Sequence, residues 1–340
     1  MKPIQCRFNS MKVNYYFESS ISLLKEIVDQ KSSLIITDEK VFNYYKKRFK
    51  NWNIFILKQG ELNKRQATVD IIINRLIELE VNRKSTLVGV GGGVITDLTG
   101  FIASIYMRGI NFGFVPTTLL SMVDASIGGK NGINVGLYKN LVGVIRQPSF
   151  ILFDLAFLNT LPRCEWKNGF AEIIKHACVK DLKMFRELEN HCYETYKKRK
   201  KFLHQLIRRN VILKSKIVQQ DEYENNVRRI LNFGHTLGHS LENQYKLSHG
   251  QAVAIGMISA CKVSEHITGF GQTKRIIHLI DKYELPTDFQ FDMQKVFEVL
   301  KMDKKGEKGD KISFVMLEKI GKGMVKPIPL YQLAKIMETL

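Results

Sequence analysis

Three histidines lie within 15 residues of one another and offer nitrogen ligands to a metal ion. His235 and His239 belong to the run Asn-Phe-Gly-His-Thr-Leu-Gly-His, and His249 follows in Ser-His-Gly. Glu172 and Lys175 come earlier, in Gly-Phe-Ala-Glu-Ile-Ile-Lys. A carboxylate with two imidazoles is a common zinc set that leaves positions for substrate oxygens. These residue types indicate metal chemistry rather than a simple binding module.

Helical spacing alone makes His235 and His239 the metal pair, because residues four apart share one face of a helix. Glu172 and Lys175 are three apart and share a face in the same way. The spacing leaves open whether His249 is the third ligand. A purely structural role is the weaker interpretation, because three of the chain's eight histidines gather here beside glycines.

A glycine-rich turn, Gly91-Gly92-Gly93, stands between a β-rich run and a helix that we expect Thr96 or Asp97 to cap. Glycines let the backbone approach a pyrophosphate, and a helix start supplies free N–H groups. The pattern departs from the usual dinucleotide fingerprint, because Thr96 replaces the last glycine and no acid follows about 20 residues later. A phosphate site and an ordinary structural turn both stay open.

The segment from Pro116 to Asn134 mixes two kinds of residue. Its hydroxyls, Asp124, paired glycines and Lys130 are polar, whereas Thr-Leu-Leu-Ser-Met-Val is largely apolar. A buried core segment has no use for so many polar groups, and an exposed loop does not need the apolar ones. We favour the half-buried wall of a site over an ordinary loop.

Composition excludes several classes of protein. The 340 residues are 44% hydrophobic and 25% charged, as expected for a globular chain of one large or two medium domains. No apolar run approaches the roughly 20 residues that span a bilayer, and the first residues lack the apolar core of a signal peptide. The five cysteines are scattered and form no Cys-x-x-Cys pattern. We therefore expect a reduced, cytoplasmic protein that is not bound to a membrane.

The net charge of +19 raises the question of nucleic-acid binding. Residues 1–162 carry 20 basic and 12 acidic side chains, and residues 163–340 carry 32 and 21, so the surpluses are 8 and 11. The one dense run, Lys197 to Lys201, is typical of a solvated helix end. Because the charge is spread, we expect attraction for small anionic substrates and no nucleic-acid partner.

The pattern of predicted elements changes near residue 160. Before it, buried strands are predicted at 33–37, 54–57, 86–90, 111–115 and 150–153, with helices at 19–29, 40–49, 65–80 and 96–107. Such alternation implies a mostly parallel sheet covered by helices. After it, helices are predicted at 164–190, 199–220, 230–245, 250–268, 273–283 and 292–302, and a strand pair at 311–317 with 324–328. We expect an N-terminal α/β domain (1–162), a mostly helical C-terminal domain (163–340), and a cleft between them.

Seven motifs in order resemble the 3-dehydroquinate synthase family of sugar phosphate cyclases, from about Thr37 to Lys305. The motifs are Gly91-Gly-Gly-Val-Ile-Thr-Asp97, Pro116-Thr-Thr-Leu-Leu, Ser126-Ile-Gly-Gly-Lys-Asn-Gly-Ile-Asn134, Lys139-Asn140, Gly169-Phe-Ala-Glu-Ile-Ile-Lys175, Leu231-Asn-Phe-Gly-His-Thr-Leu-Gly-His239 and His249-Gly-Gln-Ala-Val-Ala-Ile-Gly-Met257. The resemblance implies a Rossmann-like NAD-binding domain and a helical metal- and substrate-binding domain.

The resemblance also implies a reaction. The family converts 3-deoxy-D-arabino-heptulosonate 7-phosphate to 3-dehydroquinate and phosphate in the shikimate pathway. It does so through transient oxidation by NAD, phosphate elimination, re-reduction and intramolecular aldol closure. NAD and a divalent metal, Zn²⁺ or Co²⁺, are the implied cofactors, and a homodimer is the implied assembly.

Carried over motif by motif, the resemblance assigns three sets of residues. The implied metal ligands are Glu172, His235 and His249, which moves His239 to the substrate side and overrules the helix-spacing interpretation. The implied NAD contacts are Asp38, Glu61, Lys64, Gly91, Gly92, Gly93, Asp97, Thr117, Thr118, Asp124 and Thr160. The implied substrate and catalytic residues are Lys130, Lys139, Asn140, Lys175, Lys214, Arg228, Asn232 and His239, with Arg108 from a neighbouring subunit. One of Lys304 and Lys305 is implied as a further basic contact.

Some positions depart from the family pattern: Thr96 replaces a commoner glycine, Gln251 a glutamate and His176 a tyrosine, and Gly136-Leu-Tyr-Lys-Asn140 replaces Pro-x-Gly-Lys-Asn. They leave room for a paralogous cyclase acting on another sugar phosphate. A metal-dependent polyol dehydrogenase is the other alternative, although it has no need for the four residues Lys130, Lys175, Lys214 and Arg228 together.

Overall fold

The computed structural model describes residues 2–136, 138–292, 295–296, 298 and 311–338, which form two compact units. The first comprises Met1–Trp166 with His204–Tyr223, and the second comprises Lys167–Leu203 with Glu224–Leu340. The sequence-based division at 162/163 made each domain one continuous stretch, whereas residues 204–223 return to the first unit. Glu222 explains the return, because its carboxylate accepts hydrogen bonds from the Ser10 hydroxyl (2.6 Å) and from Gln147 Nε2 (2.9 Å).

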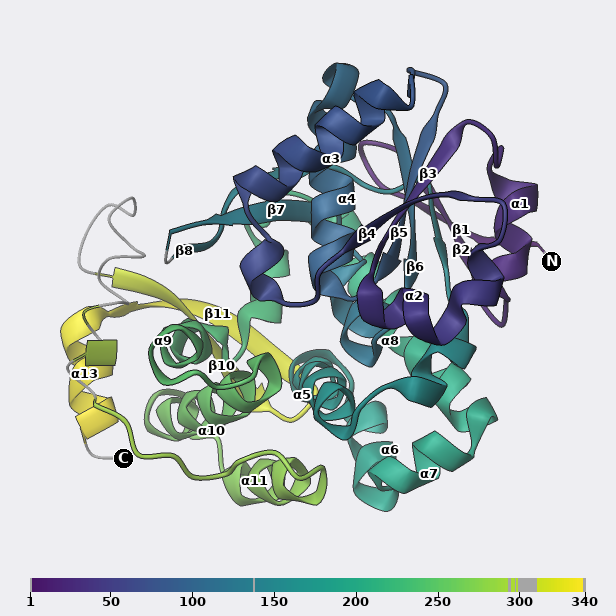
Figure 1. Cartoon of the computed structure of the whole chain (residues 1–340). Helices are drawn as coiled ribbons and strands as arrows, with labels where there is room; N and C mark the ends of the chain where they lie inside the picture. The colour runs from purple at the N-terminus through teal and green to yellow at the C-terminus, as the bar shows by residue number, and fades with distance from the viewer. Residues whose placement is uncertain (1, 137, 293–294, 297, 299–310, 339–340) are drawn as a thin grey trace. The chain divides into compact units, whose positions relative to one another are not determined.

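The first unit is built on a seven-stranded sheet in the order β1-β2-β9-β6-β5-β3-β4 (Figure 1). All neighbouring strands are parallel except β1 and β2. The strands are β1 (Ile4–Arg7), β2 (Lys12–Tyr16), β3 (Ser33–Asp38), β4 (Asn53–Leu57), β5 (Thr86–Gly91), β6 (Asn111–Pro116) and β9 (Phe150–Leu152). The five strands predicted from apolar runs are confirmed, and β1 and β2 were not predicted.

Helices pack against this sheet because their apolar faces cover its Val- and Ile-rich strands. One buried core joins Ile35, Val88, Val90 and Val115 to α2 side chains, and α4 packs against β5 and β6. The helical elements are η1 (Ile21–Leu23), α1 (Leu24–Ile27), α2 (Glu39–Tyr45), η2 (Lys46–Phe49), η3 (Glu61–Asn63), α3 (Gln66–Glu78), α4 (Gly93–Ile105), η4 (Tyr106–Arg108), η5 (Ser121–Ala125, a π-helix) and η6 (Leu155–Thr160).

An antiparallel hairpin of β7 (Lys130–Val135) and β8 (Tyr138–Ile145) also belongs to the first unit. It forms its own two-stranded sheet, and β7 packs against α4. The hairpin was not predicted, because β8 is mostly exposed and carries no buried apolar run. It carries Lys130, Lys139 and Asn140, which the family resemblance implies as substrate and catalytic residues.

The second unit is mostly helical, as predicted. Elements of the C-terminal half of the chain are α5 (Arg163–Lys180), α6 (Leu182–Asn190), α7 (Tyr193–Lys198), α8 (Lys200–Gln220), η7 (Val227–Asn232), α9 (His235–Tyr245), α10 (His249–Thr268), α11 (Thr273–Lys282), β10 (Lys311–Lys319), β11 (Lys322–Pro329) and α13 (Leu330–Glu338). The predicted helix 164–190 is interrupted at Asp181, whose carboxylate caps α6 by accepting from the Met184 amide. The predicted strand pair is confirmed as β10–β11. The predicted helix 292–302 lies mostly outside the described residues.

Helices α9 and α10 lie side by side, close enough for their backbones to be in contact, and β10 packs against α10 (Figure 1). Glycines make this approach possible: a Cβ on Gly256 would lie 1.9 Å from the Gly234 carbonyl oxygen, and one on Gly238 would lie 3.0 Å from the Ala252 oxygen. Gly234 also has φ +79°, which side chains rarely adopt. The glycines that flank the histidines therefore bring two helices together. Among the described residues, no helix is long and apolar enough to cross a membrane.

Candidate functional site

The second unit gathers Glu172 of α5, His235 of α9 and His249 of α10 around one point. Glu172 Oε1 lies 3.3 Å from His235 Nε2 and 2.9 Å from His249 Nε2. One ligand atom from each of the three residues lies within 4.8 Å of the others. This donor set of one carboxylate and two imidazoles fits a catalytic zinc-type ion that keeps open positions for substrate.

The charges around Glu172 suit metal binding. Its side chain is fully buried, and Lys175, one helical turn away, forms an ion pair with it. Burial opposes ionisation of Glu172, but Lys175 and His235 outweigh that effect and hold its pKa well below the usual range. The carboxylate is therefore ionised at neutral pH, as a metal ligand must be.

The ligand histidines are oriented through their second ring nitrogens. His235 Nδ1 lies 3.3 Å from the Phe233 carbonyl oxygen, and His249 Nδ1 lies 3.6 Å from a Glu242 carboxylate oxygen. Such contacts hold Nδ1 as the donor and leave Nε2 for the metal. Glu242 was missed by sequence reasoning, although it lies three residues after His239 and seven before His249.

His239 has a different surrounding. Its ring lies edge-on to the His235 ring with 5.0 Å between centroids, and it is exposed. It is not a member of the group of three ligands. An exposed imidazole beside a metal centre can contact a bound substrate, which agrees with the role that the family resemblance implies.

The start of α10 is fixed by a capping box. The Ser248 hydroxyl accepts a hydrogen bond from the Gln251 backbone N–H (3.4 Å). The Gln251 side-chain oxygen Oε1 accepts one from the Ser248 backbone N–H (2.9 Å). Glutamine performs this role as well as glutamate, which explains the departure at Gln251. Asn168 adds a hydrogen bond of 2.9 Å from the Gly250 amide to its Oδ1. These contacts fix the position of His249.

Arg228 and Asn232 share one carboxylate, that of Glu224. Arg228 is buried, with its Nε 3.6 Å from Glu224 Oε2, and Asn232 Nδ2 donates to Glu224 Oε1 at 2.8 Å. Glu224 therefore orients two of the implied substrate residues. Sequence reasoning missed it, and the i, i+4 spacing of an acid and an arginine is the signal that could have found it.

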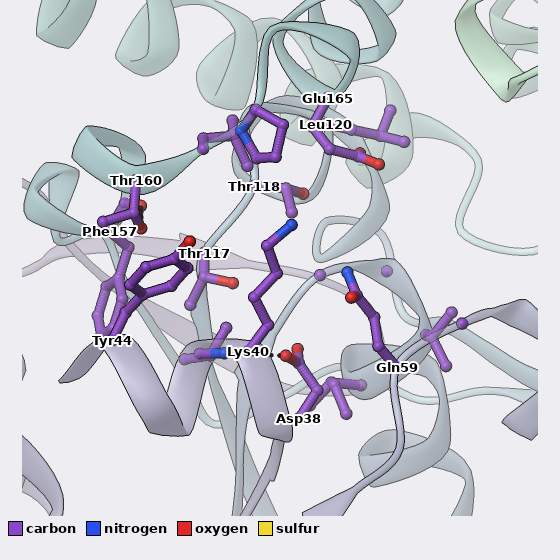
Figure 2. A pocket seen from close by; sticks show the side chains of 18 of the residues that line it. Asp38, Lys40, Tyr44, Gln59, Thr117, Thr118, Leu120, Phe157, Thr160 and Glu165 are labelled. Atoms are coloured by element: carbon purple, nitrogen blue, oxygen red, sulfur yellow. Dashed lines mark hydrogen bonds between the residues drawn. The ribbon is translucent and has the colours of Figure 1, made fainter. Parts of the chain in front are cut away.

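The first unit contains a cavity of about 330 Å³ that gathers much of the implied NAD set (Figure 2). The members of that set among its lining residues are Asp38, Glu61, Gly92, Gly93, Thr117, Thr118 and Thr160. In Figure 2 the side chains of Asp38, Gln59 and Thr117 surround one space, and Lys40 extends between them. Lys40, Tyr44 and Gln59 also line the cavity and were missed by sequence reasoning.

Sheet topology explains why distant segments meet at this cavity. Asp38 ends β3, Gly91 ends β5 and Pro116 ends β6, and these parallel strands are neighbours. Ligands of open parallel sheets bind at the carboxyl ends of the strands. The glycine motif has no acid about 20 residues downstream, but Asp38, at the end of β3, places an upstream acid at the cavity.

The helix after the glycine turn begins earlier than predicted. Gly92 is the N-cap of α4 and Gly93 its first residue, so the expectation that Thr96 or Asp97 caps the helix is wrong. Thr96 is buried inside the helix and donates to the Gly93 carbonyl at 3.0 Å. Gly91 is required for packing, since a Cβ there would lie 2.5 Å from Ile95. Gly92 and Gly93 line the cavity at the start of α4, and N–H groups at a helix start are the donors that a phosphate site uses.

Asp97 and Lys64 form an ion pair next to this turn, with Lys64 buried and Asp97 half-buried. Lys64 is 5% exposed, and its ammonium also donates to Asn140 Oδ1. Burial raises the pKa of Asp97 above its ordinary value, and Lys64 opposes that rise. Losing Lys64 would leave the half-buried Asp97 carboxylate without its ion-pair partner.

Replacing Lys64 with methionine should lower the free energy of unfolding by about 3 kcal/mol near pH 7, and by less near pH 4.5. The raised pKa of Asp97 would rise further, so its carboxyl would be neutral at the lower pH and unpaired as an anion at the higher. Urea unfolding at the two pH values measures the difference. Arg75→Met, which breaks the exposed pair with Glu78, is the control and should cost little at either pH. An equal loss for Lys64→Met at both pH values would contradict the prediction.

Lys214 of α8 and Asp124 of η5 also form an ion pair within the first unit. Lys214 Nζ donates to Asp124 Oδ1 at 2.7 Å and to the Asp124 carbonyl at 2.8 Å. Lys214 is 7% exposed. The sequence-based domains placed these two residues apart, and the return of residues 204–223 to the first unit brings them together.

The remaining implied residues lie on the surface of the first unit or outside the described residues. Lys130, Lys139 and Asn140 are exposed on the β7–β8 hairpin. Arg108 is exposed in the turn after α4, with φ +64°, and α4 spans roughly 20 Å from the glycine turn. Arg108 is therefore not brought to the nucleotide cavity. Lys304 and Lys305 lie outside the described residues.

Comparison with known proteins covers both units. The family model for the 3-dehydroquinate synthase N-terminal region matches residues 54–168, and the model for the C-terminal region matches residues 169–306. The chain is 37% identical over 339 residues to the 3-dehydroquinate synthase of Thermoanaerobacter pseudethanolicus, covering 95% of this chain and 94% of that protein.

Solved structures of related cyclases share the fold. The 2-epi-5-epi-valiolone synthase of Streptomyces hygroscopicus, with NAD⁺ and Zn²⁺ bound, aligns with TM-score 0.87 and 26% identity over 96% of this chain and 95% of that one. A 2-deoxy-scyllo-inosose synthase complexed with carbaglucose-6-phosphate, NAD⁺ and Co²⁺ aligns with TM-score 0.86 and 25% identity over 99% and 100%. The two family models match in order, and the chain is 37% identical to a 3-dehydroquinate synthase over 95% of its length. The protein therefore belongs to the 3-dehydroquinate synthase family.

Proposed function

We propose that this enzyme is a 3-dehydroquinate synthase, converting 3-deoxy-D-arabino-heptulosonate 7-phosphate to 3-dehydroquinate and phosphate in the shikimate pathway. The observation that carries the proposal is the convergence of Glu172, His235 and His249, with Lys175 paired to the buried carboxylate. The glycine-lined cavity and its Asp38 carboxylate support NAD as the second cofactor.

The donor sets fit both cofactors. When bound, NAD supplies a reversible hydride acceptor, and Zn²⁺ or Co²⁺ supplies a Lewis acid for substrate oxygens. Glu172, His235 and His249 would hold the metal, and the Asp38 carboxylate, which lines the cavity, is suited to accept hydrogen bonds from the hydroxyls of a nucleotide ribose. The exposed N–H groups at Gly92 and Gly93 would face the pyrophosphate.

The protein's own side chains would bind and orient an anionic sugar phosphate. Lys130, Lys139, Lys214 and Arg228 provide cations for the substrate carboxylate and phosphate. Arg228 is held by Glu224 and Lys214 by Asp124, so both cations have fixed positions before substrate arrives. Such preorganisation lowers the entropic cost of binding, and positioned cations stabilise a developing negative charge during phosphate loss.

We also propose a cytoplasmic homodimer. Arg108 lies exposed in a turn where Met107, Arg108 and Gly109 all have positive φ, far along α4 from the glycine turn. This position supports a role in reaching the substrate phosphate of a partner subunit. All five cysteines are free thiols, which supports a reducing compartment.

One assay tests the reaction against its alternatives. The purified protein with NAD and Zn²⁺ should release phosphate from the heptulosonate phosphate without accumulating NADH, because the hydride is returned. Glucose 6-phosphate and sedoheptulose 7-phosphate are the matched substrates for paralogous cyclases and should be poor. Stoichiometric NADH without phosphate release would indicate a polyol dehydrogenase and contradict the proposal.

A further inference from the structure

We propose that Asn134 is a positioning residue that holds Glu61, on the nucleotide side, and Asn140, on the substrate side, in one hydrogen-bonded unit. The inference rests on the proposed function, because that function assigns Glu61 to NAD and Asn140 to the sugar phosphate. Asn134 itself belongs to none of the implied site sets.

Asn134 lies in β7 but falls outside the β7–β8 pairing register. The register of β7 and β8 shifts between Ile133 and Val135, so Asn134 occupies a bulge. Its amide instead donates to the Lys64 carbonyl at 2.8 Å, and it forms an isolated parallel bridge with Arg65. Bulges next to active sites commonly redirect one side chain.

The side chain at this bulge uses both ends of its amide. Asn134 Nδ2 donates to Glu61 Oε1 at 2.8 Å, and Asn134 Oδ1 accepts from the Asn140 backbone amide at 2.9 Å. Asn140 has φ +55°, a conformation that asparagine adopts more readily than most residues other than glycine. The hydrogen bond from its amide to Asn134 helps to hold the turn in this conformation.

Lys64 is hydrogen-bonded to both Asn134 and Asn140. Its ammonium donates to Asn140 Oδ1 and pairs with Asp97, while its carbonyl accepts from Asn134. Glu61 and Asn140, almost 80 positions apart in the sequence, are therefore linked through Asn134 and Lys64. A displacement of either the 61–65 segment or the hairpin is transmitted to the other.

A side chain that served only to close the hairpin would need the bond to Asn140 alone. The side-chain contact to Glu61 reaches a different segment, as does the backbone contact to Lys64. Together, the side-chain contacts to Glu61 and Asn140 require a group that donates to a carboxylate while accepting from a backbone amide. A carboxamide does both, whereas aspartate can only accept when ionised. Asn134→Asp therefore separates the two functions: it keeps the acceptor for Asn140 and places a negative charge against Glu61.

The test is a double-mutant cycle on NAD binding, measured by calorimetry on the full-length protein. Asn134→Asp should weaken NAD binding about tenfold, the effect of losing one hydrogen bond to a charged group. In a Glu61→Gln background the same change should weaken it less than about twofold, because the glutamine amide can donate to the new carboxylate. The Michaelis constant for the sugar phosphate should rise about tenfold in Asn134→Ala and change little in Asn134→Asp.

Asn53→Ala is the matched control, since Asn53 also donates from Nδ2, to the Lys31 carbonyl at 3.3 Å, at an exposed site. This variant should change neither the dissociation constant for NAD nor the Michaelis constant for the sugar phosphate. Equal weakening of NAD binding by Asn134→Asp in both backgrounds, or a fall in melting temperature with both constants unchanged, would overturn the inference. If the wild-type protein binds NAD but releases no phosphate, the proposed function fails while the cycle still decides the inference. If it does not bind NAD, both fail.

Discussion

Replacing His249 with alanine should remove the metal and the activity together. Outer contacts of a bound metal are commonly worth 10- to 100-fold in affinity, so loss of a ligand should weaken metal binding by more than about a hundredfold. Phosphate release should fall by a factor of about a thousand or more, because substrate oxygens would no longer be polarised. Metal content after dialysis, measured by mass spectrometry, checks the first part, and a phosphate assay checks the second.

His239→Ala is the matched control, because the rings of His239 and His249 both lie against the His235 ring, but of these two histidines His249 is the one that contacts Glu172. It should retain the metal while lowering turnover about a hundredfold, the scale of a lost general acid, base or orienting group. Metal loss in His239→Ala with retention in His249→Ala would show that the i, i+4 pair holds the metal. Melting temperatures of the metal-free proteins separate either effect from misfolding.

Replacing Gly256 with alanine should destabilise the second unit by about 3 kcal/mol and weaken metal binding. The new Cβ would lie 1.9 Å from the Gly234 carbonyl oxygen, which is backbone and cannot rotate away. Helix α9 must then move from α10, and His235 and His249 move apart with their helices. Urea denaturation followed by circular dichroism measures the stability, and metal titration measures the affinity.

Gly271→Ala provides the comparison, because a Cβ at Gly271 meets nothing within 4 Å. This variant should unfold at the same urea concentration as the wild type, or at a slightly higher one. If Gly256→Ala is as stable as Gly271→Ala and binds metal normally, the helices can separate at no cost, and the packing argument is incorrect.

The parallel strands could be predicted because their two buried faces require continuous apolar runs, such as Leu87-Val-Gly-Val. Strands β1 and β2 at one side of the sheet and the hairpin β7–β8 could not be predicted, because exposed residues interrupt their apolar pattern. The helix-spacing argument selected His239 because spacing describes one helix at a time. The structure places His249 of the next helix beside Glu172, a contact that depends on how α9 and α10 pack.

The residues that orient the site were harder to predict than the residues that form it. Glu224, Glu242 and Asn134 are ordinary polar residues in the sequence, and each acquires a role only through a neighbour brought by folding. The implied ligands and cations came from the family resemblance, whereas residue types alone left His249 undecided. The start of α4 was misjudged because Gly92 caps it without a side-chain hydrogen bond.

The return of residues 204–223 to the first unit has a consequence for synthesis on the ribosome. The chain leaves the first unit after Trp166 and rejoins it at His204, so the first unit is incomplete until Tyr223 has emerged. Until then Ser10 and Gln147 lack the Glu222 carboxylate, and Asp124 lacks Lys214. Domains that are continuous in sequence can fold one after another during translation. Here the nascent nucleotide-binding unit must wait for part of the second unit to be made, and a fragment ending at Trp166 would lack the helix that completes it.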